Sequence, residues 1–69
     1  MAAMDITLNG EPRSLASALT VQQLLQAEGL VERRVAVEVN GAIVPRSRHE
    51  SHALAPGDRV EIVHALGGG

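Results

Sequence analysis

Apolar and polar residues alternate strictly over residues 4–8. A period of two is typical of a strand with one buried face, so we expect a β-strand here. Asn9-Gly10 follows at once, and both residue types accept the positive φ angles of a type I′ hairpin turn. A second strand over residues 11–15 should return antiparallel to the first. Pro12, which has no backbone N–H, places that strand at a sheet edge.

After Thr20 the spacing of apolar residues changes from two to three and four, which predicts an amphipathic helix. Thr20 is placed to cap the first turn, and Gln23, three residues on, can complete a capping box. Gly29 supplies the left-handed residue that commonly ends a helix. The predicted helix turns three apolar residues toward the core: Val21, Leu24 and Leu25.

Alternation returns over residues 35–39, which predicts a third strand with an inward valine face. Asn40-Gly41 repeats the hairpin signal of the first turn. Residues 42–44 then form a short apolar segment that Pro45 ends, and we expect a short strand there. Residues 46–53 are polar and lack a clear period, so we expect a loop or a short helical turn.

The turn signal Ala55-Pro56-Gly57-Asp58 leads into a final alternating segment, residues 59–66. The predicted order is therefore hairpin, helix, strand, short strand, strand. This order indicates an α+β fold in which one main helix lies across a mixed sheet of four to five strands. We expect one domain over residues 1–66 and a flexible glycine tail over residues 67–69.

The composition narrows the chemistry. The 69 residues include no Phe, Tyr, Trp or Cys, and all six basic residues are arginines. A domain of this size buries only about 60% of its unfolded surface, so the core must be thin and aliphatic. The absence of Cys excludes disulfides, thiolate metal sites and a catalytic thiol.

Charge and hydropathy exclude two kinds of partner. The net charge is −2, and no basic face combines with aromatic residues, so we expect no nucleic acid. No apolar run approaches the roughly 20 residues of a membrane helix, and the first residues lack the features of a secretory signal. We therefore expect a cytoplasmic protein without a membrane partner, and a monomer when alone.

Side chains able to carry out catalysis are few. His49 and His52 are three residues apart, but no third ligand or helix accompanies them, so we interpret them as solvated loop residues. His64 shares strand parity with the inward residues of the last strand, and we expect it to pack near the end of the sheet. No serine stands in a nucleophile elbow and no pair of carboxylates stands out. We expect no catalytic residue and no metal site.

The unusual feature is the terminal run Gly67-Gly68-Gly69, directly after a predicted strand. Glycine has no Cβ, so such a tail can enter a slot that is too narrow for other residues. Three extended residues span roughly 10 Å, at about 3.3 to 3.6 Å each. A folded body that carries a thin thread ending in a carboxylate has the shape of a substrate for another protein's active site.

Several motifs together resemble the ThiS family, the sulfur carrier proteins of thiamine biosynthesis, which have the ubiquitin-like β-grasp fold. The most specific are Asn-Gly-x-Ile-Val-Pro-Arg and Val-Glu-Ile-Val-His-Ala, and the terminal glycines are shared with other ubiquitin-like carriers. The resemblance covers nearly the whole chain from Met4. Its segments are Asn9–Arg13, Thr20–Leu25, Val35–Gly41, Ile43–Arg46 and Gly57–Gly69.

The resemblance implies a carrier that is not itself an enzyme and binds no cofactor. An E1-like adenylyltransferase would use ATP to activate the Gly69 carboxylate as an acyl-adenylate. Sulfur from a cysteine desulfurase or another donor would displace AMP, and the resulting thiocarboxylate would deliver sulfur to thiazole synthase. No catalytic role is carried over to Pro45 or Arg46, and Pro45 is interpreted as a structural turn residue.

A docking surface for these partners is expected beside the tail. By strand parity its outward residues are Glu61, Val63 and Ala65, with Leu66 at the strand end and Ala36 on the neighbouring strand of the β-grasp order. A small exposed apolar patch of this kind suits a transient protein interface. Many relatives carry a larger residue near this strand end than Ala65 or Leu66.

Three other functions stay open at the level of the sequence. The small subunit of molybdopterin synthase uses the same thiocarboxylate chemistry for another cofactor. A ubiquitin-like modifier would join its terminus to target lysines, although a chain without lysine cannot link to its own kind. A plain binding module would make no use of its glycines.

Overall fold

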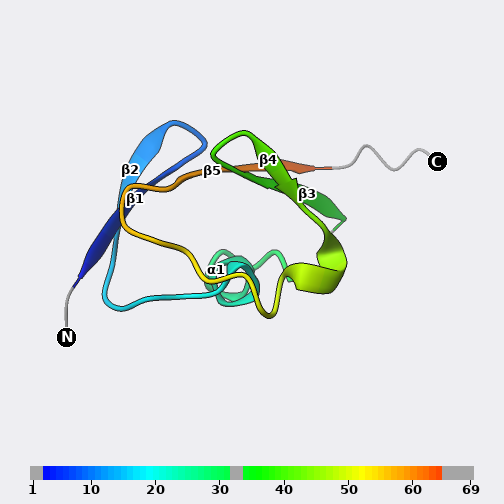
Figure 1. The fold of residues 1–69 in the computed structure, drawn as a ribbon, viewed down its shortest axis with the longest axis horizontal. Coiled ribbons are helices and arrows are strands. Elements are labelled where there is room, and N and C mark those ends of the chain that lie inside the picture. The colour runs from blue at the N-terminus through cyan, green and yellow to red at the C-terminus, as the bar shows by residue number, and fades with distance from the viewer. Residues whose placement is uncertain (1–2, 32–33, 65–69) are drawn as a thin grey trace.

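The computed structural model describes residues 3–31 and 34–64. Its elements follow the predicted order, and the described part of the last strand runs to His64 (Figure 1). They are β1 (Met4–Leu8), β2 (Glu11–Leu15), α1 (Val21–Ala27), β3 (Val35–Val39), β4 (Ala42–Val44), the short 3-10 helix η1 (Arg46–Arg48) and β5 (Arg59–His64). Ala65 and Leu66, predicted to extend the last strand, lie outside the described residues.

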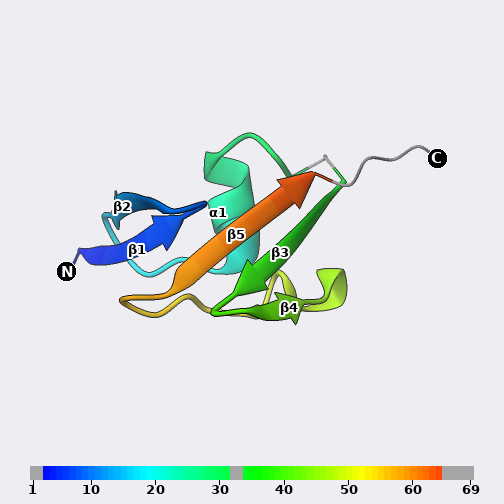
Figure 2. The same ribbon diagram turned by 90° about the horizontal axis from the view of Figure 1, so that it is seen from above.

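The five strands form one mixed sheet in the order β2-β1-β5-β3-β4. Two antiparallel hairpins, β1–β2 and β3–β4, flank β5, which runs parallel to β1 and antiparallel to β3 (Figure 2). The last strand of the chain is thus the central strand of the sheet. Together with helix α1, this arrangement is the β-grasp fold, and the predicted fold class is confirmed.

Both hairpin turns adopt the left-handed conformations that their sequences predicted. Asn9 and Gly10 have φ angles of 52° and 84°, and Asn40 and Gly41 have φ angles of 54° and 85°. Two consecutive positive φ angles define a type I′ turn, which matches the twist of the strands that it joins. A β-branched residue at any of these positions would be strained.

Helix α1 is capped as predicted. The Gln23 main-chain N–H donates to Thr20 Oγ1 over 3.2 Å, and the Thr20 N–H donates to Gln23 Oε1 over 2.9 Å. Glu28 is the C-cap residue, and Gly29 follows with a φ of 73°. These interactions satisfy main-chain groups that a helix of seven residues leaves without internal partners at its ends.

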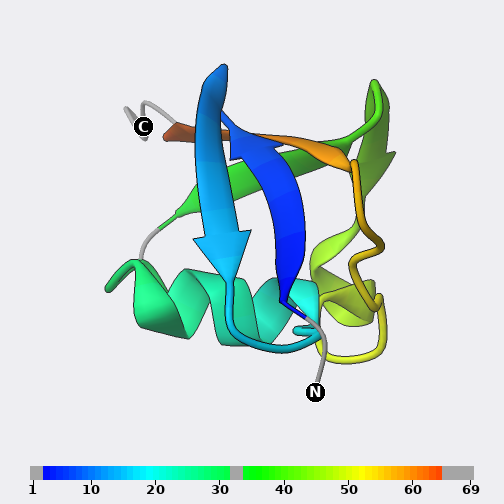
Figure 3. The same ribbon diagram turned by 90° about the vertical axis from the view of Figure 1, so that its left-hand side faces the viewer.

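The helix covers one face of the sheet and leaves the other face open (Figure 3). Val21, Val37 and Val60 are completely buried between the two layers, and each fully buried side chain of this type stabilises the fold by about 1.5 to 3 kcal/mol. The core is aliphatic, as the composition required. Its members are Met4, Ile6, Leu8, Val21, Leu24, Leu25, Val37, Val39, Val44, Leu54, Val60 and Ile62.

The loop after β4 corrects one prediction. His49, predicted to be solvated, is buried, and its Nε2 lies 3.1 Å from the Val44 carbonyl oxygen. Because a carbonyl oxygen only accepts, Nε2 is the donor in this contact. The His49 and His52 carbonyls accept from the Gln22 and Val21 N–H groups, each over 2.9 Å. The loop therefore caps the start of α1, which buries His49 and leaves His52 half-buried.

Within residues 3–31 and 34–64, no helix is both long enough and apolar enough to cross a membrane.

Candidate functional site

The strand that leads to the predicted glycine tail is anchored at its start by side chains. The Asn40 N–H donates to the Arg59 carbonyl over 2.8 Å, and the Arg59 N–H donates to Asn40 Oδ1 over 2.9 Å. Asn40 Nδ2 also donates to Asp58 Oδ1 over 3.0 Å, while Asp58 Oδ2 accepts from the Ala55 N–H over 2.8 Å. On the other side, the Thr7 N–H donates to the Asp58 carbonyl over 3.0 Å. β5 therefore starts from a position fixed on both sides.

Asn9 extends this anchoring to the middle of β5. Its main-chain N–H donates to the Val60 carbonyl over 2.9 Å, and its side-chain Oδ1 accepts from the Ile62 N–H over 2.8 Å. Oδ1 thus takes the place that a main-chain carbonyl would fill if β1 continued. The sequence marked Asn9 only as a turn residue, because nothing in the local pattern shows which distant amide its side chain meets.

The described members of the predicted docking surface lie together on the open face of the sheet. Ala36 is opposite Val63, and Glu38 is opposite Glu61, in the β3–β5 register. Ala36, Glu61 and Val63 are exposed, and Val63 keeps 56% of its surface accessible. Their outward positions agree with the predicted parity. Ala65, Leu66 and the three terminal glycines, including Gly69, lie outside the described residues.

His64 differs from its prediction. It has the parity of Val60 and Ile62, but it is exposed rather than packed. It lies at the last described position of β5, opposite Val35, which is itself only partly buried. Across the described ranges, no group of three His, Cys, Asp or Glu side chains is placed to hold a metal ion.

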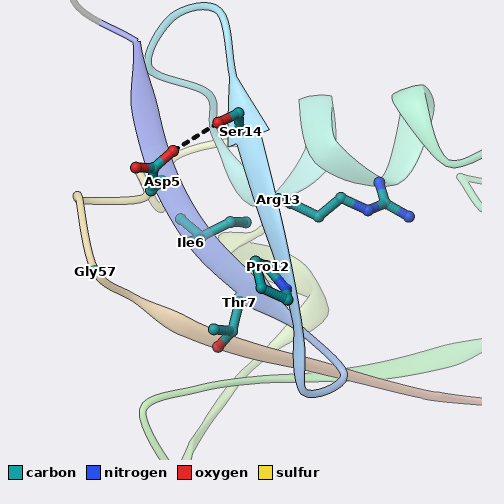
Figure 4. A pocket seen from close by; sticks show the side chains of 7 residues that line it. All are labelled: Asp5, Ile6, Thr7, Pro12, Arg13, Ser14 and Gly57. Carbon is teal, nitrogen blue, oxygen red and sulfur yellow. Dashed lines mark hydrogen bonds between the residues drawn. The ribbon is translucent and has the colours of Figure 1, made fainter.

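A hollow of about 470 Å³ lies on the β1–β2 hairpin, near the start of β5 (Figure 4). The Ser14 hydroxyl donates to Asp5 Oδ1 over 2.6 Å, and the Arg13 side chain points away toward α1. Asp5 and Ser14 are thus bonded to each other within the hairpin, and the Arg13 guanidinium is turned away from the hollow. The lining residues are Asp5, Ile6, Thr7, Pro12, Arg13, Ser14 and Gly57.

A second hollow, of about 200 Å³, lies beside the later half of β5. Arg13 and Glu28 form a two-bond ion pair at its wall, with Arg13 Nη1 2.6 Å and Nη2 3.2 Å from the two carboxylate oxygens. This hydrogen-bonded contact with Glu28 raises the pKa of the Arg13 guanidinium above its ordinary value. The lining residues are Leu8, Asn9, Glu11, Arg13, Glu28, Leu30, Ile62 and His64.

The fold and the position of β5 place the molecule among small ubiquitin-like β-grasp proteins, and the comparisons define the family. The sequence profile of the ThiS family matches residues 6–69, which includes the glycine tail. The chain belongs to the ThiS family.

Solved structures and curated proteins agree with this assignment. A crystal structure of the thiamine biosynthesis protein ThiS from Geobacter metallireducens has a TM-score of 0.84 and 33% identity, covering 96% of this chain and 100% of that one. The sulfur carrier protein ThiS of Escherichia coli (strain K12) is 29% identical over 66 residues, which are 96% of this chain and 100% of that protein.

Two longer relatives contain a similar sequence as one part of their length. Thiazole synthase of Paramagnetospirillum magneticum is 44% identical over 66 residues, covering 96% of this chain. The chain spans only 20% of the length of that relative, and the same share of a second thiazole synthase from Magnetococcus marinus.

Proposed function

We propose that the protein is a sulfur carrier for the synthesis of the thiamine thiazole ring, with the Gly69 carboxylate as its reacting group. The observation that carries the proposal is the match to the ThiS family, which runs through Gly67, Gly68 and Gly69. The fold supports it, because the central strand, fixed at its start, leads directly to this tail. The likeness to thiazole synthases supports that enzyme as the sulfur acceptor.

Partner enzymes would carry out the activation of the Gly69 carboxylate and the sulfur transfer. A carboxylate is a poor acyl donor, so an E1-like adenylyltransferase would join it to AMP from ATP, releasing pyrophosphate. A persulfide sulfur, from a cysteine desulfurase or another donor, would attack the acyl carbon and displace AMP. Reductive cleavage of the resulting S–S bond by a thiol would leave a C-terminal thiocarboxylate. Gly67 and Gly68 would let the tail adopt the backbone angles of a narrow active site.

The open sheet face would be the surface that partners grip. Ala36, Glu61 and Val63 lie next to one another on this face. Ala65 and Leu66 would continue the surface toward the tail. A small apolar patch with one carboxylate suits a partner that binds, reacts and leaves, because it buries little surface.

Intact-mass spectrometry tests the proposal. The protein is incubated with ATP, the adenylyltransferase of the same organism, a cysteine desulfurase and cysteine. Its mass should rise by about 16 Da, since one oxygen is exchanged for a sulfur. A variant lacking Gly69 and a variant with one alanine added after Gly69 serve as controls, and both should lose sulfur delivery to thiazole synthase.

An unchanged mass under conditions that convert the Escherichia coli sulfur carrier protein ThiS would contradict the proposal. Covalent conjugates to lysines of other proteins would favour a modifier instead. Sulfur transfer to the large subunit of molybdopterin synthase, but not to thiazole synthase, would favour the other cofactor pathway.

A further inference from the structure

Among the described residues, the later half of β5 has a neighbouring strand on one side only, which is β3. The bonds between Asn40 and Arg59 set the parity of the ladder, so Glu61 and Val63 direct their main-chain groups toward β3. The alternate residues, Ile62 and His64, direct theirs toward the β1 side. Pairing with β1 ends at Leu8 opposite Val60.

Beyond that point Asn9 Oδ1 satisfies the Ile62 N–H, and the chain turns away. In the described part of the chain, no hydrogen bond reaches the Ile62 carbonyl or the His64 N–H from that side. Figure 2 shows β5 continuing past the end of β1 with no strand beside it there. One carbonyl and one N–H, spaced as in a β-ladder, thus form an open edge next to the tail.

The open edge borders the 200 Å³ hollow. Leu8, Leu30 and Ile62 contribute its apolar lining. Its polar lining comes from Asn9, Glu11, His64 and the Arg13–Glu28 ion pair. The hollow is several times the ~30 Å³ that one water occupies in the liquid, so it can hold an aliphatic side chain. In a strand added to this edge, alternate side chains would point into the hollow, and the others would join the open sheet face.

We propose that this edge, formed by the Ile62 carbonyl and the His64 N–H above the hollow of Leu8, Leu30 and Ile62, receives an extended segment of the acceptor enzyme as an added strand. The segment carries an aliphatic side chain that fills the hollow. The inference rests on the proposed function, in which thiazole synthase is that acceptor. Main-chain pairing supplies affinity and the hollow supplies specificity, as in other strand-addition interfaces.

The arrangement suits a carrier. An added strand would pair with β5 up to His64, and two residues separate His64 from the first tail glycine. The pairing would orient the chain before the tail and leave the glycines free to enter the active site. The edge is short, with one donor and one acceptor, so the interface releases the carrier once sulfur is transferred. The short edge also protects the free protein from pairing with itself, because long open edges promote aggregation.

Amide exchange measured by NMR tests the inference on the unmodified chain. In the free protein the His64 amide should exchange fast, whereas the Glu61 and Val63 amides, bonded to β3, should exchange slowly. Saturation with thiazole synthase of the same organism should slow exchange at His64 at least tenfold. An unchanged His64 exchange rate in the saturated complex would overturn the inference.

A matched pair of variants tests the same bond by affinity. His64→Pro removes the N–H, and His64→Ala keeps it while removing the imidazole. Loss of one main-chain bond predicts about tenfold weaker binding for the proline variant and no more than about threefold for the alanine variant. NMR spectra of both variants establish that the fold is intact.

Equal affinities of the two folded variants, or no binding by the unmodified chain, would overturn the inference. The proposed function would fail separately, through an unchanged mass in the adenylation assay, because activation of Gly69 does not require the edge to meet thiazole synthase.

Discussion

The two ends of β5 are held differently. At Arg59 and Val60 the strand has β1 on one side and β3 on the other, and Asp58 and Asn40 add side-chain bonds. At His64 only β3 pairs with it among the described residues. One strand of six residues thus changes from a fixed central strand to a one-sided edge. The start of β5 is therefore held on both sides. At its later end, main-chain groups remain available to a partner that would bind the tail.

The largest expected effect is a difference in stability between variants at the two ends of β5. Val60 and His64 have the same strand parity, but only Val60 is buried. Val60→Ala should lower the free energy of unfolding by about 2 to 3 kcal/mol, because it removes apolar volume from a fully buried site. His64→Ala, at the exposed end, should change it by no more than about 0.5 kcal/mol. Urea unfolding followed by circular dichroism measures both. Equal losses would mean that the later half of β5 is as tightly packed as its start.

A smaller effect separates the two turn asparagines. Glycine keeps the positive φ angle and removes the side chain, so Asn40→Gly and Asn9→Gly isolate the side-chain bonds. Asn40→Gly loses two bonds and should cost about 1 to 3 kcal/mol, while Asn9→Gly loses one and should cost about 0.5 to 1.5 kcal/mol.

Asn9→Asp is the control for the second variant, because it keeps an acceptor for the Ile62 N–H and should cost less than Asn9→Gly in the same urea assay. A larger loss of stability for Asn9→Gly than for Asn40→Gly would contradict this order. It would mean that the single bond to Ile62 contributes more than the two bonds at the start of β5.

The smallest effect concerns the wall of the hollow beside the open end. Arg13→Gln removes the ion pair with Glu28. The two side chains, Arg13 and Glu28, are 43% and 23% exposed, so the loss of stability should be small and should shrink as salt is added. Arg13→Lys keeps the charge without the two-bond geometry and should behave as an intermediate.

The same pair makes a statement about pH. The pKa of Arg13 is raised in the folded protein, so its contribution is fully present below its ordinary value and is lost only as the pH rises through the higher folded value. Arg13 should therefore stay charged between pH 6 and 9. The difference in stability between Arg13→Gln and the unmodified chain should not change over this range through Arg13 ionisation. Thermal unfolding across this range measures it, and a difference that falls at pH 9 would contradict the assignment.

Much of this architecture could be predicted from the sequence, because its signals are local. Asn9-Gly10 and Asn40-Gly41 predict type I′ turns, and the Thr20 capping box predicts the start of the helix; all three predictions are confirmed. The outward positions of Ala36, Glu61 and Val63 followed from strand parity. The role of Gly69 stays a prediction, since it depends on partners.

The errors involve long-range contacts. His49 was predicted to be solvated, yet the loop folds back on the start of α1 and buries it. His64 has inward parity, yet it is exposed at the last described position of β5. A period of two tells which face a residue points to, but not whether another element covers that face.

The sequence by itself determined the turns, the helix and the alternating faces, because each depends on residues within a few positions of one another. Only the tertiary structure decided that β5 becomes the central strand and that the Asn9 side chain meets Ile62, 53 residues away. It also decided that the ladder to β1 ends before β5 does. The register between distant strands arises from packing of the whole core, and that packing determines which main-chain groups remain open.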